Sequence, residues 1–227
     1  MWKKTLKIVK NTLLNLAFPD SCFFCKTKGT LLCPDCASLC DISPAHQKRR
    51  VKFIADCYAA CSYRNRLVKR LIAQFKYEPF CSQLAAPLSV LIANHFSLLD
   101  QKPDFSSYTI VPVPLSKQRQ RWRGFNQAKE LADQLAVILD LECDSKCLIR
   151  TKNTATQVGL PSNKRALNIA GAFACPTRKD VAGKKILLID DIITTGATME
   201  ECAKTLLKNG AAEIVALAVA HAEVSDV

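Results

Sequence analysis

Hydrophobic and polar positions along the chain follow two patterns. One pattern predicts β-strands and the other predicts α-helices. Short runs of β-branched and aliphatic residues with few charges are typical of buried parallel strands. Apolar positions that recur every three or four residues, with polar side chains between them, are typical of amphipathic helices. Strands are expected at residues 56–63, 109–113, 184–189 and 213–220, and helices at residues 2–16, 65–75, 84–99, 124–139 and 197–209.

Strands and helices alternate after residue 50, which predicts an α/β fold, a parallel sheet with helices on both faces. Residues 20–40 show little periodicity and are rich in Cys, Pro and Asp, so we expect them to fold around something other than a hydrophobic core. The chain is therefore expected to divide into residues 1–50, an N-terminal helix with a small cysteine-rich module, and residues 51–227, the α/β domain.

Composition excludes several classes of protein. Of the 227 residues, 49% are hydrophobic and 23% are charged, which excludes wholesale disorder. No apolar run approaches the roughly 20 residues that span a bilayer, and lysines interrupt residues 1–18. We therefore expect a cytoplasmic protein with reduced thiols, without a membrane span or a targeting segment.

The net charge of +12 is concentrated at the start of the chain. Residues 1–80 carry 15 basic and 5 acidic side chains, whereas residues 81–227 carry 17 and 15. The densest basic clusters lie at residues 48–52 and 64–70. Such clusters are either solvated faces or binding sites for a polyanion, and composition leaves both interpretations open.

Four of the twelve cysteines form two closely spaced pairs, Cys22 with Cys25 and Cys33 with Cys36. Each pair is a C-x2-C knuckle, and four thiolates complete the tetrahedral shell of a structural zinc ion. Cys40 is an alternative fourth ligand, and free redox-active thiols are the competing hypothesis. The scattered remaining cysteines are expected to pack as small hydrophobic residues.

The most informative run spans residues 186–198 and reads Ile-Leu-Leu-Ile-Asp-Asp-Ile-Ile-Thr-Thr-Gly-Ala-Thr. A buried strand leads into the carboxylates of Asp190 and Asp191 and then into a loop that opens a helix. Backbone N–H groups at a helix start bind phosphate, and Gly196 lets the phosphate approach closely. The carboxylates suit a sugar diol or a metal ion. A Walker-type nucleotide loop is excluded here because its Gly-Lys-Ser/Thr ending is absent.

This run resembles, at all thirteen positions, the phosphoribosyl pyrophosphate (PRPP) signature of the type I phosphoribosyltransferases. The resemblance implies that Asp190 and Asp191 hold the ribose hydroxyls and that Mg²⁺ accompanies PRPP. It also implies a parallel sheet with the ligand at the carboxyl edge of the strands. The residues implied to wrap the 5′-phosphate are Thr194, Thr195, Gly196, Ala197 and Thr198.

Further motifs narrow the resemblance. They are Val-Pro-Val-Pro-Leu-Ser at residues 111–116, Arg-Gly-Phe-Asn-Gln at residues 123–127 and a polar stretch from Arg150 to Arg165. With the cysteine knuckles, they are similar to the ComF family, phosphoribosyltransferase-like proteins linked to natural competence, the uptake of DNA by bacteria. The resemblance implies a zinc-containing, PRPP-binding protein that acts in DNA uptake and transformation. Its implied partners are single-stranded DNA and competence-machinery proteins such as a helicase.

By position, Leu115, Ser116 and Lys117 resemble the pyrophosphate loop of that family, and residues 150–165 resemble the mobile loop that closes over the ligand. The arginine run that follows, Arg119, Arg121 and Arg123, has three interpretations. It suits pyrophosphate, a single-stranded nucleic acid with Trp122 and Phe125 as stacking rings, or a solvated helix approach. Further nucleic-acid candidates are Lys48, Arg49 and Arg50.

Enzymatic turnover is a hypothesis and not an inference from the residues. We identify no segment that would form a base-binding pocket and no convincing general base. The sequence therefore does not identify an acceptor nucleophile. The alternative function is a metabolic phosphoribosyltransferase that transfers the 5-phosphoribosyl group to an unidentified acceptor, with the zinc module serving only stability.

Overall fold

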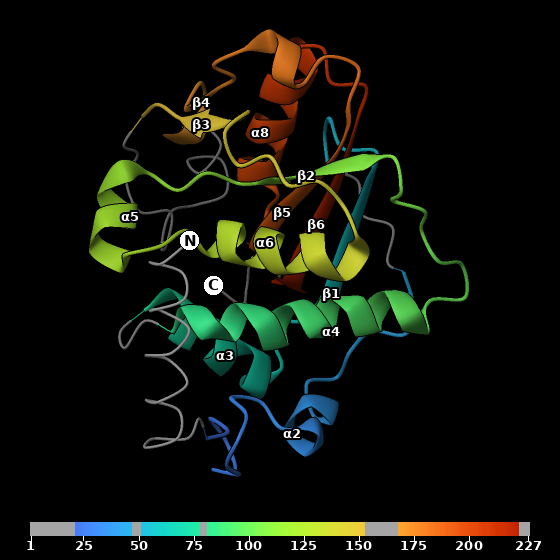
Figure 1. Cartoon of the computed structure of the whole chain (residues 1–227), viewed down its shortest axis with the longest axis vertical. Coiled ribbons are helices and arrows are strands. Elements are labelled where there is room, and N and C mark those ends of the chain that lie inside the picture. Colours follow the sequence, from blue (N-terminus) through green and yellow to red (C-terminus); the bar gives the residue numbers. More distant parts are fainter. Residues whose placement is uncertain (1–20, 47–50, 78–80, 153–167, 223–227) are drawn as a thin grey trace, which may run out of the picture. The chain divides into compact units, whose positions relative to one another are not determined.

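A computed structural model describes residues 21–46, 51–77, 81–152 and 168–222 (Figure 1). The chain divides into two compact units, Met1–Cys40 and Asp41–Val227. The second unit thus begins ahead of the boundary expected after residue 50. The helix predicted at residues 2–16 lies outside the described residues.

The second unit is built on a four-stranded parallel sheet with the order β1-β6-β5-β2. These strands span Asp56–Ser62 (β1), Tyr108–Pro112 (β2), Lys185–Ile193 (β5) and Glu213–His221 (β6). Aliphatic residues fill the central pair β5 and β6, and seven consecutive residues of β6 are buried, as expected of a strand covered on both faces. The sheet therefore forms the core of this unit.

Helices cover both faces of the sheet (Figure 1). On one face, α4 (Ala85–Leu98) and α6 (Gln127–Leu139) pack against the strands and against each other. On the other face, α8 (Ala197–Lys208) buries Met199, Cys202, Ala203 and Leu206 in one cluster with Ile186 and Leu188 of β5. The predicted fold class is confirmed.

The remaining elements are short, apart from α3. Helix α3 (Arg66–Lys76) follows β1, and α5 (Lys117–Arg123) follows β2. Short strands β3 (Ile149–Arg150) and β4 (Phe173–Ala174) pair antiparallel, and the first unit contains α2 (Pro34–Ser38). Single turns of 3₁₀ helix lie at Ser82–Leu84 and Arg178–Asp180. None of the described helices is long and apolar enough to cross a membrane.

Strand β5 is longer than predicted. We expected it to end at residue 189, but it continues to Ile193 because Asp190, Ile192 and Ile193 pair with Ala218, Ala220 and His221 of β6. The two adjacent carboxylates therefore lie on the strand itself. Because side chains alternate along a strand, Asp190 and Asp191 point to opposite faces of the sheet.

Candidate functional site

A cavity of about 420 Å³ opens at the carboxyl edge of the sheet, where open parallel α/β sheets generally bind ligands. Its walls come from the ends of β2 and β5, the segments that follow them, the residues that flank α3, and the start of α6. All seven residues predicted to bind PRPP line this cavity: Asp190, Asp191, Thr194, Thr195, Gly196, Ala197 and Thr198. The fold brings these residues together, and their role in binding stays a prediction.

The loop between β5 and α8 has the geometry of a phosphate cradle. Gly196 lies just before α8 with a φ of 79°, a conformation that favours glycine, and an added Cβ would meet Val51 Cγ1 at 3.0 Å. Helix α8 begins at Ala197, whose N–H donates to Thr195 Oγ1 at 3.4 Å. The first turn of α8 therefore directs backbone N–H groups and the positive end of the helix dipole at the cavity.

Asp191 is paired with a residue that the sequence motifs did not single out. Lys76, the last residue of α3, places its Nζ 2.8 Å from Asp191 Oδ1, and Asp191 is only 5% exposed. Burial opposes the charge on Lys76, but the carboxylate of Asp191 outweighs it and raises the pKa of Lys76. The ion pair with Lys76 thus fixes the direction of the Asp191 side chain.

Asp190 is in a different electrostatic position. Burial, and then the neighbouring charge of Asp191, raise its pKa to about 7, while Lys76 and Arg150 act in the opposite direction. Asp190 also accepts a hydrogen bond from the N–H of Asp191 at 2.9 Å. The two carboxylates are therefore inequivalent: Asp191 has a fixed cationic partner, whereas Asp190 changes charge near neutral pH.

This difference predicts a pH-dependent effect of Asp190→Asn on the unligated protein. Because folding raises the pKa of Asp190 from 3.8 to about 7, the folded state binds more protons than the unfolded state between those values. The free energy of unfolding therefore falls as the pH rises through that window. We expect Asp190→Asn to stabilise the protein by about 1–3 kcal/mol at pH 8 and hardly at all at pH 4, as measured by urea unfolding. An equal gain at both pH values, or a gain matched by the exposed Asp140→Asn, would contradict this assignment.

The predicted pyrophosphate loop is only partly at the cavity. Leu115 lines it, together with Pro114 and Val113. Ser116 is buried and instead caps α5, because its Oγ accepts a hydrogen bond from Arg119 N–H at 3.3 Å. Lys117 is exposed and is not a lining residue. Ser116 therefore shapes the loop, and Leu115 is the residue of the three that faces the cavity.

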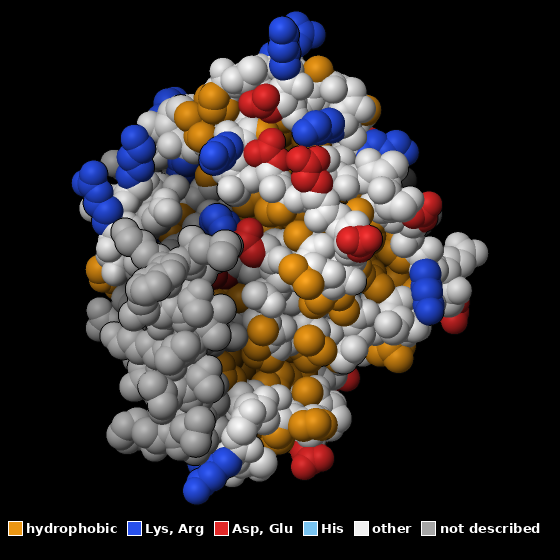
Figure 2. Space-filling model, in the orientation of Figure 1, with side chains coloured by type: hydrophobic (Ala, Val, Ile, Leu, Met, Phe, Trp, Pro, Cys, Tyr) orange, Lys and Arg blue, Asp and Glu red, His pale blue; other side chains and the backbone are white. Residues whose placement is uncertain are grey.

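The arginine run separates into two groups. Arg119 and Arg123 line the cavity, whereas Arg121 is exposed and does not. Figure 2 shows Lys and Arg side chains gathered over α5. Arg119 Nη2 and Arg123 Nε are buried and lack a hydrogen-bond partner among the described residues. Such donors are expected to be satisfied by an anion when the cavity is filled.

Crowding of positive charge supports the same interpretation. Arg150 is a third arginine in the cavity lining. Burial lowers the pKa of both Arg123 and Arg150, and the nearby charge of Arg119 lowers them further. An anionic ligand would relieve this repulsion between guanidinium groups.

The Asn-Gln pair that follows Gly124 holds Arg123 and the start of α6 in place. Asn126 caps α6 by accepting from Ala128 N–H, and its Nδ2 donates to the carbonyl of Val113 at 3.1 Å. Gln127 is buried, accepts a hydrogen bond from Arg123 and donates to the carbonyl of Phe75 at 3.1 Å. These two amides tie α5 and α6 to the ends of β2 and α3.

Some of the predicted residues lie outside the described part of the chain. The nucleic-acid candidates Lys48, Arg49 and Arg50 lie outside the described residues, and so does most of the expected mobile loop, residues 153–165. Conversely, Tyr63, Lys76 and Tyr77 line the cavity although no motif pointed to them. The fold brings them there from the two ends of α3.

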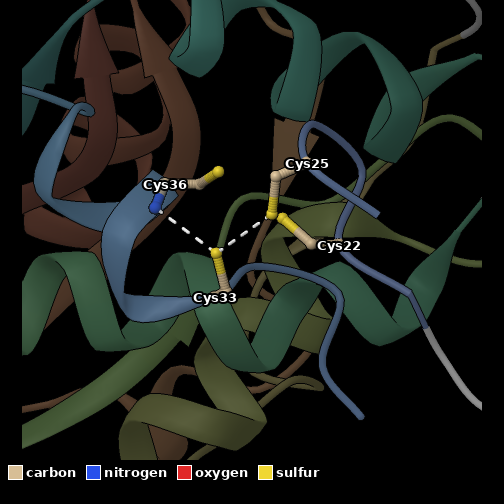
Figure 3. A group of neighbouring side chains, drawn as sticks. All are labelled: Cys22, Cys25, Cys33 and Cys36. Carbon is tan, nitrogen blue, oxygen red and sulfur yellow. Dashed lines mark hydrogen bonds between the residues drawn. The ribbon is translucent and has the colours of Figure 1, made fainter. Parts of the chain in front are cut away.

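The four predicted metal ligands cluster in the first unit. The sulfur atoms of Cys22, Cys25, Cys33 and Cys36 all lie within 4.8 Å of one another and face a common centre (Figure 3). Tetrahedral Zn–S bonds of about 2.3 Å would place the sulfurs roughly 3.8 Å apart, so an ion requires little movement. Cys40 lies outside this group and its thiol donates to the carbonyl of Cys36.

Both knuckles are held by local hydrogen bonds. In the first, Cys22 N–H donates to the Thr27 carbonyl at 2.8 Å and Lys26 N–H donates to the Cys22 carbonyl at 3.0 Å. In the second, Cys33 precedes α2 and its sulfur accepts from Cys36 N–H at 3.5 Å. The turns and the short helix therefore direct the four thiols inward.

The acidity of these thiols is uneven. Burial opposes ionisation of Cys22, but backbone N–H groups outweigh it and lower its pKa to about 6. Burial, and then the other three thiols, raise the pKa of Cys36 to about 12. Four adjacent thiols cannot all ionise without a cation between them, so the cluster is compatible with a structural zinc site.

Comparison with known protein families identifies the class of fold. Residues 121–226 match the model of the phosphoribosyl transferase domain, a range that contains the β5 signature and most of the residues that line the cavity. The second unit therefore has a type I phosphoribosyltransferase-like fold.

Three bacterial relatives then narrow the family. The chain is 39% identical over 150 residues to DNA utilization protein YhgH of Escherichia coli, covering 63% of each chain. It is 40% identical over 114 residues to Competence protein F of Haemophilus influenzae, covering 50% of each chain. It is 33% identical over 162 residues to Competence protein ComFC of Bacillus subtilis, covering 66% of this chain and 58% of the relative. The chain thus spans less than two thirds of the length of these relatives. They confirm the resemblance to the ComF family.

Proposed function

We propose that this ComF-like protein binds PRPP with Mg²⁺, carries a structural zinc ion, and acts in natural competence, DNA uptake and transformation by binding single-stranded DNA. The cavity at the carboxyl edge of the sheet carries this proposal. It combines two carboxylates, a phosphate-type loop and three arginines in one space of about 420 Å³. These groups match the diol, the 5′-phosphate and the pyrophosphate of PRPP.

Each part of the cavity has a distinct chemical task in this proposal. Asp190 and Asp191 accept hydrogen bonds from the ribose hydroxyls, and carboxylate oxygens are also suitable outer contacts for hydrated Mg²⁺. The loop at residues 194–198 receives the 5′-phosphate through backbone N–H groups. Arg119, Arg123 and Arg150 receive the pyrophosphate, whose charge Mg²⁺ would partly neutralise.

A comparison of ligand fragments tests whether both ends of the cavity are used together. Ribose 5-phosphate should occupy the loop and the acidic pair, and inorganic pyrophosphate with Mg²⁺ should occupy the arginines. We expect PRPP to bind at least tenfold more tightly than either fragment, because one molecule satisfies both groups of residues. Fragments that bind as tightly as PRPP, or a PRPP affinity too weak to measure, would oppose the proposal.

Arg119 and Arg121 provide a matched pair for the pyrophosphate end. Arg119→Gln removes a cavity donor and should weaken PRPP binding by about 10- to 100-fold, because a charge-assisted hydrogen bond contributes roughly 1.5–3 kcal/mol. Arg121→Gln makes the same chemical change two residues away on the exposed side and should leave the Kd within about twofold. Equal losses in the two variants would assign the arginines a general electrostatic role.

The DNA-binding part of the proposal is supported by the names of the relatives, which refer to competence and DNA utilization, and by the positive charge of the first 80 residues. Single-stranded DNA binding should weaken steeply with salt, because phosphate contacts release counterions. Charge reversal at Lys48, Arg49 and Arg50 should weaken it further. An affinity that is indifferent to salt would count against DNA binding by this chain.

A further inference from the structure

The outer face of α3 carries positively charged side chains that do not line the cavity. Arg66, Lys69 and Arg70 are exposed, and their spacing of three and four residues places them on one patch of the helix. Residues 57–77 contain no Asp or Glu. We call these three side chains the α3 patch; a patch of a single sign along a helix attracts a polyanion.

The α3 patch borders the mouth of the cavity. Lys69 Nζ lies 5.4 Å from the centre of the Tyr63 ring, and Tyr63 lines the cavity. Lys76 follows Lys69 by two helical turns on the same side of α3, and its Nζ pairs with Asp191 inside the cavity. Positive charge therefore continues from the α3 patch to the cavity mouth, and a polyanion could contact both at once.

Aromatic rings stand at the same mouth. Tyr77 is 47% exposed and Trp122 is 55% exposed, and both line the cavity. The guanidinium carbon of Arg123 lies 5.9 Å from the Tyr77 ring centre and 6.0 Å from that of Trp122. Exposed rings interleaved with cations are the combination that binds single strands, because unpaired bases stack on the rings while phosphates contact the cations.

We propose that the α3 patch and the ring trio Tyr63, Tyr77 and Trp122 form one surface for single-stranded DNA, with the backbone along α3 and bases stacked at the cavity mouth. This inference rests on the DNA-binding function proposed above and locates it on α3 and α5. The rings select single strands, since a duplex keeps its bases stacked inside and an acidic peptide offers only charge.

Fluorescence anisotropy with a labelled single-stranded oligonucleotide tests the charged half of this surface. Arg66→Glu combined with Lys69→Glu should weaken binding at least tenfold and reduce the slope of log K against log salt by about 1.4, at roughly 0.7 per phosphate contact. The control is Lys179→Glu combined with Lys208→Glu, which changes charge equally at exposed residues that do not line the cavity. It should leave the affinity within about threefold.

Trp122→Ala tests the stacking half. It should weaken single-stranded DNA binding by about 5- to 150-fold, as expected for roughly 1–3 kcal/mol per stacked base, without changing the salt slope. Trp122→Phe should retain most of the affinity. Binding of a duplex of the same length should be weaker in the native chain and unaffected by Trp122→Ala.

The possible outcomes distinguish a failure of the proposed surface from a failure of the proposed DNA-binding function. Salt-dependent binding of single strands that survives both the α3 changes and Trp122→Ala would overturn the surface and leave the DNA-binding function standing. No binding of single strands by the native chain would overturn both. Equal affinity for duplex DNA or for polyglutamate would also overturn the surface, because it would show a charge effect without stacking. PRPP affinity, measured separately, should be unchanged by the α3 variants.

Discussion

Asp190→Asn combined with Asp191→Asn is expected to weaken PRPP binding at least 100-fold while the zinc content stays unchanged. The neutral amides are poorer acceptors for the ribose hydroxyls, and two charge-assisted hydrogen bonds contribute roughly 3–6 kcal/mol together. Calorimetric titration of the variant beside the native chain, with metal analysis of both, measures the two expectations directly.

The control replaces two aspartates that do not line the cavity, Asp140→Asn and Asp180→Asn, and should bind PRPP normally. Because Asp191→Asn also removes the partner of Lys76, far-ultraviolet circular dichroism must show that the variant is folded. The single variant Asp190→Asn keeps that ion pair and should still lose at least tenfold in affinity. A folded double variant that binds PRPP like the native chain would remove both carboxylates from the proposed site.

Loss of the four-cysteine cluster is the second change with a large expected effect. A structural zinc ion in a small module contributes about 10–16 kcal/mol of apparent binding free energy, so without it residues 21–40 should no longer hold their fold. We expect Cys33→Ser to reduce the zinc content of the purified protein from about one ion per chain to a small fraction and to open this segment to limited proteolysis.

Cys81→Ser is the matched control, because Cys81 lies outside the cluster and should leave zinc and protease resistance unchanged. Cys40→Ser should also retain zinc, since the thiol of Cys40 is directed at a backbone carbonyl. If the native protein instead contains no zinc and its thiols oxidise reversibly, the redox hypothesis replaces the structural one.

Much of the fold was predictable because buried parallel strands have a strong local signal. The run predicted at 109–113 is β2 at Tyr108–Pro112, and the predicted helix at 197–209 is α8. The end of β5 was not predictable in this way. Two adjacent aspartates resemble the end of a strand, and only pairing with β6 extends β5 through them.

The candidate site likewise contains residues that the sequence predicts and residues that only the fold brings to the cavity. Residues 190–198 are contiguous, so one run of sequence predicts both carboxylates and the phosphate loop. Lys76 and Tyr77 reach the cavity only because α3 ends there, and no local pattern indicates that. The division of the arginines has a local signal in the sequence, because Arg119 and Arg123 are four residues apart on a helix and Arg121 lies on its other side.

Calorimetric titration of the native chain with PRPP in the presence of Mg²⁺ tests the central claim most directly. We predict saturable binding of one PRPP per chain, together with a higher temperature of thermal unfolding at saturation. The absence of saturable heat, with no shift of thermal unfolding at millimolar PRPP, would contradict the assignment of this cavity.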